Sequence, residues 1–223
     1  QLGMVERHHP RPDVRHANQQ ALARQVTREI GKPYAEALGE VQEVIDTCDF
    51  FLGEGRRLYG QTVPSELPAK QPFTHRMPVG TTMIVTAANF PAAVPSWYLV
   101  PALLCGNSVV WKPGEDSAAV AQALTSLFHA GGVPADLLVT VVADGATTFS
   151  ALEQVLEAGL VQKVGFTGSS AVGSRIGELC GRRHRAVVGE DHVECEIALR
   201  RQCSEHELQV AHPRACEALG VVL

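Results

Sequence analysis

The sequence has no excess of positive charge, no long apolar run and no dense set of cysteines. Its 223 residues carry 19 Lys and Arg against 24 Asp and Glu, giving a net charge of -5. Nucleic-acid binding requires a basic face, so this charge balance argues against a nucleic-acid partner. No apolar run reaches the roughly 20 residues that a membrane-spanning helix needs. We therefore expect neither nucleic-acid binding nor membrane insertion.

The six cysteines are scattered along the chain and do not form the dense framework typical of small secreted domains. Cys48, Cys105 and Cys180 fall in predicted helices, where cysteine commonly acts as a small buried hydrophobe. The first residues show no secretory signal pattern. We expect a cytoplasmic protein, and the hydrophobic content of 45% with 19% charged residues predicts a soluble globular fold.

The sequence also lacks the common phosphate-binding glycine motifs. Residues 168–173 read Gly-x4-Gly without the Lys-Ser/Thr of a P-loop, and no Gly-x-Gly-x-x-Gly is present. Taken alone, this stretch is typical of a helix whose start is capped by serine. Its small residues would nevertheless let backbone N–H groups approach a pyrophosphate.

What the sequence does contain is a regular alternation of strand and helix patterns. Residues 83–88 form a short apolar run typical of a buried strand, residues 92–104 are apolar around most of a helix, and residues 108–112 form a second strand. Parallel α/β sheets bind ligands at the carboxyl ends of their strands. Asn89 and Lys112 each follow such a strand, so we expect both to face one crevice.

The alternation continues to residue 191. Further strands are expected near 137–142, 162–166 and 186–188, and further helices near 117–130, 147–158 and 170–181. The predicted fold class is α/β: a Rossmann-like, mostly parallel five-stranded sheet with flanking helices, preceded by a helical N-terminal segment. No internal repeat interrupts it.

We divide the chain into three parts. Residues 1–80 hold N-terminal helices and an extended segment, residues 81–191 form the nucleotide-binding domain, and residues 192–223 are a tail that breaks the pattern. Within the first part, the polar residues 1–20 are expected to be loosely held. Helices are expected at 21–28 and 34–58, and prolines predict an extended chain over 61–79.

Three signatures, in this order, resemble the cofactor-binding portion of the aldehyde dehydrogenase superfamily. They are Asn89-Phe90-Pro91, Lys112-Pro113-Gly114-Glu115 and Phe166-Thr167-Gly168-Ser169, and the similarity spans roughly residues 20 to 185. The resemblance implies NAD as the cofactor, with NADP less favoured, because a carboxylate at Glu115 accepts from ribose hydroxyls and repels a 2'-phosphate. On spacing alone, a solvated turn before a helix is the better explanation of Lys112 and Glu115, and the other two signatures favour cofactor contact instead. The cofactor-binding residues implied are Val85, Thr86, Ala87, Ala88, Lys112, Glu115, Phe166, Gly168, Ser169 and Val172.

The resemblance also implies catalytic residues. Asn89 matches the amide that stabilises an oxyanion, a contribution of about 3 kcal/mol, although a turn-forming asparagine explains the residue equally well. Ala87-Ala88 stands where the family commonly has Pro-Trp. Glu190 matches the family's general base, but the glycines that normally follow that base are replaced by Asp191-His192-Val193.

The family oxidises an aldehyde through a cysteine thiolate, passes hydride to the cofactor and hydrolyses the thioester. That cysteine lies in a second, downstream domain, and Cys195, Cys203 and Cys216 lack its flanking residues. We therefore expect a truncated relative with weak or no autonomous oxidation of an aldehyde.

Two further hypotheses remain open. The first is a non-catalytic subunit that binds NAD or a full-length relative through residues 34–80, and truncation favours either a homo-oligomer or such a complex. The second is a zinc module on the tail, but we expect no metal site. Its candidate ligand pairs are His192-x2-Cys195, Cys203-x2-His206 and His212-x3-Cys216.

Overall fold

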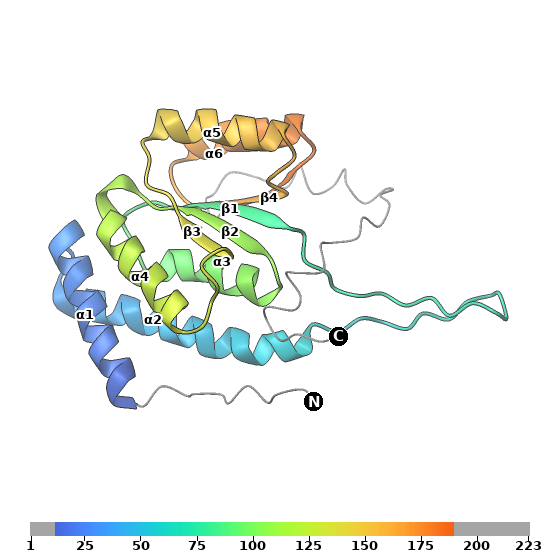
Figure 1. The fold of residues 1–223 in the computed structure, drawn as a ribbon, viewed down its shortest axis with the longest axis horizontal. Coiled ribbons are helices and arrows are strands. Elements are labelled where there is room, and N and C mark those ends of the chain that lie inside the picture. Colours follow the sequence, from blue (N-terminus) through green and yellow to red (C-terminus); the bar gives the residue numbers. More distant parts are fainter. Residues whose placement is uncertain (1–11, 190–223) are drawn as a thin grey trace.

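A five-stranded parallel sheet forms the centre of the computed structural model, which describes residues 12–189 (Figure 1). The strands lie in the order β3-β2-β1-β4-β5. Their bounds are β1 (Thr81–Val85), β2 (Ser108–Lys112), β3 (Leu138–Thr140), β4 (Lys163–Phe166) and β5 (Ala186–Gly189). The helices are α1 (Pro12–Ile30), α2 (Tyr34–Glu54), α3 (Ala93–Leu104), α4 (Ala118–Ala130), α5 (Gly145–Glu157) and α6 (Ser170–Arg182), with single 3₁₀ turns η1 (Gly55–Arg57) and η2 (Glu115–Ser117). The predicted fold class is confirmed.

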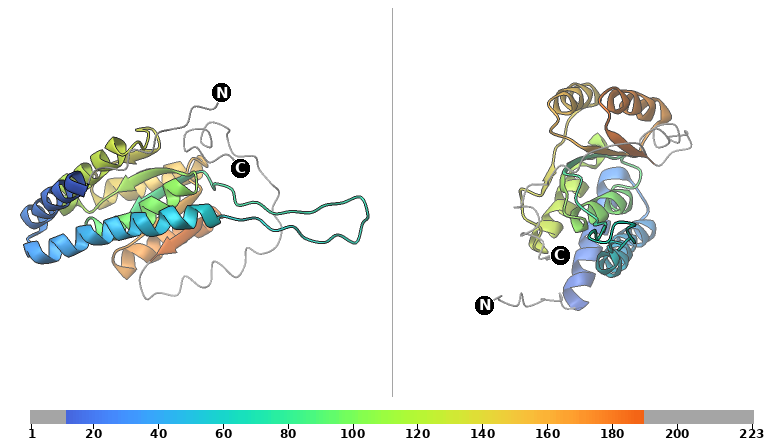
Figure 2. Two further views of the ribbon diagram at one scale, coloured as in Figure 1. Left: turned by 90° about the horizontal axis from the view of Figure 1, so that it is seen from below. Right: turned by 90° about the vertical axis from the view of Figure 1, so that its right-hand side faces the viewer.

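Helices cover both faces of the sheet. Figure 2 shows α5 and α6 together on one side and α1 to α4 on the other. Each side has its own apolar core: Leu99, Trp111 and Leu124 belong to the α1–α4 side, whereas Leu152, Val164 and Ile176 belong to the α5–α6 side. Both faces of the sheet are buried, as is usual for parallel strands.

The first strand begins two residues earlier than predicted and ends at Val85, so residues 86–88 lie beyond it. The apolar run did not predict the start of the strand, because the polar residue Thr82 belongs to it and is only 5% exposed. Its hydroxyl donates to the Ser108 carbonyl at 3.1 Å, which satisfies a buried polar group.

Helix α1 is also longer than predicted. Residues 12–20, expected to be loosely held, are helical. Pro12 occupies the first helical position, where proline is favourable because its missing N–H has no partner there. Leu22, Ala23 and Val26 are buried in the same apolar core as α2, which anchors the helix.

Residues 59–79 leave the sheet as a projecting pair of extended segments, here called the arm (Figure 1). The arm has an antiparallel bridge between Thr62 and Phe73, and the Thr74 N–H donates to the Gln61 carbonyl at 2.8 Å. A Cβ on Gly60 would lie 1.7 Å from the Thr74 carbonyl oxygen, so only glycine fits at the base. The extended prediction is therefore correct. Apolar side chains exposed along the arm are Tyr59, Val63, Leu67, Phe73, Met77 and Val79.

Among residues 12–189, no helix has the length and apolar character needed to cross a membrane.

Candidate functional site

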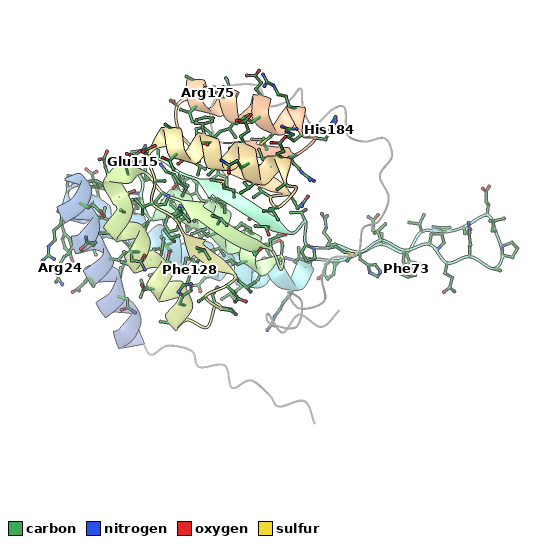
Figure 3. All side chains as sticks on the ribbon, turned by 45° about the horizontal axis from the view of Figure 1, so that its top comes forward. Arg24, Phe73, Glu115, Phe128, Arg175 and His184 are labelled. Carbon is green, nitrogen blue, oxygen red and sulfur yellow. The ribbon has the colours of Figure 1, made fainter. Side chains whose placement is uncertain are left out.

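A hollow of about 200 Å³ lies at the carboxyl ends of β1, β2 and β4, beside α5 and α6. It brings together segments from three parts of the sequence. Eight of the residues that the sequence singled out line it: Val85, Thr86, Ala87, Lys112, Phe166, Gly168, Ser169 and Val172. Figure 3 shows Glu115 and Arg175 toward this end of the molecule, away from Phe73 on the arm.

Part of the lining of this hollow comes from the end of β1, and hydrogen bonds to the neighbouring β2 fix its position. The Trp111 indole Nε1 donates to the Thr86 hydroxyl at 3.0 Å, and the Thr86 N–H donates to the Lys112 carbonyl at 3.1 Å. Trp111 is fully buried, and Thr86 is 3% exposed. The tryptophan therefore fixes a hydroxyl that lines the hollow.

Lys112 is a cation that lines the hollow, and its charge interacts with the carboxylates of Glu115 and Asp144. Its residue is 8% exposed, and its Nζ is 4.0 Å from Glu115 Oε1. Hydrogen bonds from Thr147 hold the pKa of Asp144 below its usual value, and the charge of Lys112 lowers it further. An ammonium group in this place can donate to hydroxyl or phosphate oxygens of a ligand.

The N-termini of α3 and α4 lie at the same edge, and each is already occupied by a carboxylate from the N-terminal helices. Glu40 Oε1 accepts the N–H groups of Ala92 and Ala93 at 2.8 and 3.2 Å. Glu29 accepts the N–H groups at the start of α4, both at 2.7 Å. A second anion at either helix end would meet charge repulsion.

Helices α5 and α6 differ in how they begin. Asp144 caps α5 by accepting the Thr147 N–H at 2.7 Å, so that end also carries negative charge. Ser169 caps α6 with a neutral hydroxyl. Of the four helix starts at this edge in the described chain, α6 is therefore the one without a carboxylate cap, and it best accommodates an anion.

Asn89 does not share the hollow with Lys112, although we expected both to face one crevice. It lies in a neighbouring shallow cleft of about 600 Å³, together with Ala88, Lys32 and Asp116. Gly114 approaches Ala88 closely near these hollows, because a Cβ placed on Gly114 would lie 2.8 Å from the Ala88 Cβ. Ala88 and Asn89 border the cleft, while Lys112 borders the hollow.

Several residues that line the hollow were missed at the sequence level. They are Gly145, Thr148, Phe149, Leu152, Thr167 and Ile176. Three of these lie on α5 at positions 148, 149 and 152, which form one helical face, so the periodicity held a usable signal. Arg175 lies 4.1 Å above the Phe149 ring and joins α6 to α5 beside the hollow.

Some predicted residues lie outside the described chain. They are Glu190 and the tail residues His192, Cys195, Cys203, His206, His212 and Cys216. Within residues 12–189, no group of three or more His, Cys, Asp or Glu side chains could hold a metal ion.

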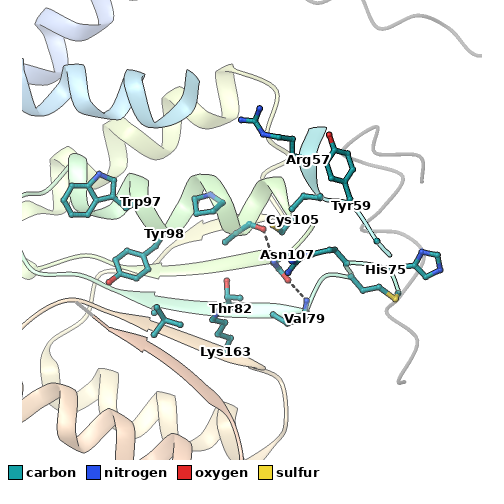
Figure 4. A pocket seen from close by; sticks show the side chains of 18 of the residues that line it. Arg57, Tyr59, His75, Val79, Thr82, Trp97, Tyr98, Cys105, Asn107 and Lys163 are labelled. Carbon is teal, nitrogen blue, oxygen red and sulfur yellow. Dashed lines mark hydrogen bonds between the residues drawn. The ribbon is translucent and has the colours of Figure 1, made fainter. Parts of the chain in front are cut away.

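A larger groove of about 1,220 Å³ lies on the α3 side of the sheet, at the base of the arm (Figure 4). Its lining includes Trp97 and Tyr98 from α3 and the cations Arg57, Arg76 and Lys163. The Tyr98 hydroxyl lies 3.1 Å from the Phe166 carbonyl oxygen and 2.8 Å from the Thr167 hydroxyl. One aromatic side chain thus joins the groove to the strand end that borders the small hollow.

Comparison with known proteins gives consistent matches to one family. A sequence model described as "Aldehyde dehydrogenase family" matches residues 13–191. Glutarate-semialdehyde dehydrogenase of Pseudomonas putida is 37% identical over 165 residues, covering 74% of this chain and 34% of that protein. An NADP-dependent succinate-semialdehyde dehydrogenase of Escherichia coli is 36% identical over 165 residues, covering 74% of this chain and 34% of that protein.

The structural comparison agrees. The crystal structure of an Escherichia coli NADP-dependent enzyme superposes with a TM-score of 0.75 at 32% identity, covering 84% of this chain and 40% of that chain. The chain spans about a third of the length of the curated relatives it matches.

Proposed function

The chain belongs to the aldehyde dehydrogenase family, and from that premise we propose that its sheet binds NAD as the hydride acceptor for oxidation of an aldehyde. The observation that carries the proposal is the convergence of Lys112, the β1 end and the uncharged start of α6 on one hollow. When bound, the cofactor would supply a nicotinamide ring that takes up hydride. The adjoining residues would hold and orient it.

The chemistry of the hollow fits the adenosine part of a dinucleotide. Phe149, Leu152, Val172 and Ile176 provide apolar walls for a flat base. Whole small-molecule sites usually have roughly 300–1,000 Å³, so a volume of about 200 Å³ suits one part of the ligand. The pyrophosphate would then lie against the N–H groups at the start of α6.

Two carboxylates favour NAD over NADP. Glu115 has a side chain that is 55% exposed, 4.0 Å from the Lys112 ammonium, where it can accept from ribose hydroxyls. Glu29 already fills the N-terminus of α4, so that helix end is not open to a 2'-phosphate. The Escherichia coli relative is named for NADP, which makes this preference a property to be measured.

Asn89 is proposed as the amide that donates to the aldehyde oxygen as negative charge develops there. It is exposed and lies in the cleft next to the cofactor hollow. Among residues 12–189 the cysteines are Cys48, Cys105 and Cys180, and none lines that cleft. Burial, with the charge of Asp49, raises the pKa of Cys48 to about 11, which makes that thiol a poor nucleophile. We propose weak or no oxidation through these three thiols, and the semialdehydes for which the two relatives are named are the substrate class to assay.

Calorimetric titration with NAD and NADP tests the cofactor proposal. We expect NAD to bind to the parent chain. Lys112→Met should lower the affinity for both nucleotides at least tenfold, because their oxygens lose a cationic hydrogen-bond donor. Glu115→Gln should reduce the ratio of NAD affinity to NADP affinity about tenfold. The variant removes the repulsion between the carboxylate and the 2'-phosphate of NADP, and a tenfold change corresponds to roughly 1.4 kcal/mol. Glu153→Gln, at an exposed site on α5, is the matched control for lost charge. No binding of either nucleotide would refute the proposed function.

A second candidate, a non-catalytic subunit, is favoured by the exposed arm. Phe73 and Tyr59 are 63% and 69% exposed, and apolar surface of this kind favours association. We propose that the arm joins copies of the chain, or this chain and a full-length relative.

We also propose a cytoplasmic location, because Cys48, Cys105 and Cys180 are free thiols.

Phe73→Asp is expected to raise the dissociation constant for this association at least tenfold, because a charged group replaces an apolar contact. Sedimentation velocity over a concentration series gives the constant, with the chain alone and with added full-length relative. Leu160→Asp, 63% exposed before β4 and off the arm, is the control. If both variants associate like the parent chain, the arm is not the interface.

A further inference from the structure

We propose that Glu40 is a positioning residue that holds the Asn89-Phe90-Pro91 turn in place. Its consequence for catalysis rests on the proposed role of Asn89, whereas the structural coupling stands by itself. Glu40 lies on α2, and the turn lies between β1 and α3. No part of the three sequence signatures includes Glu40.

The burial of Glu40 needs an explanation. The residue is 3% exposed and lies on the buried face of α2 with Ala37, Val41 and Val44. A carboxylate in such surroundings is costly unless it is paired and hydrogen-bonded. Glu40 meets that requirement entirely through groups at the Asn89 turn and its neighbour Lys32.

One oxygen of Glu40 supplies the cap that α3 lacks. The N-cap residue of α3 is Ala92, which makes no side-chain cap hydrogen bond and is among the poorest residues for that position. Glu40 Oε1 accepts the N–H groups of Ala92 and Ala93, 52 and 53 positions along the chain. A charged acceptor at a helix start also interacts favourably with the helix dipole.

The other oxygen reaches the turn through Lys32. Glu40 Oε2 forms an ion pair with the Lys32 ammonium, and that ammonium lies 3.7 Å from the centre of the Phe90 ring. Glu40 is therefore connected to both sides of the turn. Its ion-pair partner Lys32 makes a cation–π contact with Phe90, and its carboxylate accepts the backbone N–H of Ala92 directly. Asn89, the residue before Phe90, shares its cleft with Lys32.

Glu29 provides a natural comparison. It caps α4 with both oxygens, at 2.7 Å each, but its carboxylate makes no recorded bond to the Asn89 turn within residues 12–189. The two glutamates perform the same capping at different helices. Glu29 also lines the Asn89 cleft, so loss of a nearby charge alone predicts similar effects at Asn89 for both glutamates, whereas positioning predicts a larger effect for Glu40.

The test uses the full chain with isotope label in its three asparagines, Asn18, Asn89 and Asn107. Glu40→Gln is expected to shift or broaden the Asn89 side-chain amide signal and to speed hydrogen exchange of the Ala92 and Ala93 amides at least tenfold. The Asn107 amide, held by Val79 and Ala102, is the internal reference and should not move. Glu29→Gln should speed exchange of residues 119–122 and move the Asn89 signal less than Glu40→Gln does.

Lys32→Gln keeps the α3 cap and a hydrogen-bond donor beside Glu40, and it removes the cation that contacts Phe90, so it provides a second test if Glu40→Gln folds poorly. We expect it to move the Asn89 signal without speeding exchange in α3. Equal movement of Asn89 and Asn107, or an equal response to Glu29→Gln, would overturn the proposal. NAD affinity should stay within twofold in Glu40→Gln, so a failure of NAD to bind the parent chain would be recognised separately.

Discussion

Replacing Gly114 by alanine is expected to lower NAD affinity at least tenfold and the free energy of unfolding by about 1–3 kcal/mol. The added Cβ would lie 2.7 Å from the Ala88 nitrogen and 3.0 Å from its Cα. These are backbone atoms, so the end of β2 would have to move away from the end of β1. Gly114 has an ordinary φ of -58°, which shows that the glycine is needed for close approach.

The effect on affinity follows from where this contact lies. Gly114 follows Lys112-Pro113, and its contact Ala88 lies between Ala87, which lines the hollow, and Asn89, which lines the cleft. Moving the two strand ends apart would displace both groups at once. Calorimetric titration and urea unfolding measure the two effects.

Gly177→Ala is the control for this prediction. It lies inside α6, and an added Cβ there meets nothing within 4 Å. This variant should gain about 0.5–1 kcal/mol of stability and bind NAD as the parent chain does. If Gly114→Ala also binds NAD unchanged, the contact with Ala88 does not shape the site.

Trp111→Ala is expected to lower the free energy of unfolding by about 3–5 kcal/mol. Trp111 is fully buried at the centre of the sheet, so its removal leaves a large cavity. It also leaves the Thr86 hydroxyl without its donor. Since domains are typically stable by roughly 5–15 kcal/mol, a substantial part of the total would be lost.

Urea unfolding followed by far-ultraviolet circular dichroism measures this loss. Trp97→Phe is the matched control, because Trp97 is the other tryptophan and borders the open groove. We expect it to cost less than about 1.5 kcal/mol, because an aromatic ring is retained at a half-buried site that borders an open groove. Similar losses for Trp97→Phe and Trp111→Ala would contradict the central packing role of Trp111.

The order and type of the elements could be predicted because their signals are local. Apolar runs such as 108–112, with Gly and Pro between them, identify strands and helices without knowledge of contacts elsewhere. The shared hollow of Lys112 and Phe166 also follows, since parallel strands end at one edge. The start of α1 was missed because a polar helix face resembles an irregular terminus.

The remaining features depend on contacts between distant residues. Glu40 reads as one polar position on α2, and its cap on α3 appears only when the two helices meet. Asn89 and Lys112 line different hollows, and the approach of Gly114 to Ala88 joins two strand ends that no spacing rule relates. The part of α5 in the hollow depends on how α5 packs against the sheet.

The position of β1 in the middle of the sheet has a consequence for the order in which the chain folds. β1 pairs on one side with β2, which follows soon after it in sequence, and on the other side with β4, whose first residue is Lys163. Closing the shorter loop costs less chain entropy. During synthesis, the β1–α3–β2 unit can therefore assemble before β4 has left the ribosome. Helices α1 and α2 have been synthesised by then and can cover the face of the sheet on which α3 lies. The sheet would grow outward from this nucleus, and the edge strand β5 would join last.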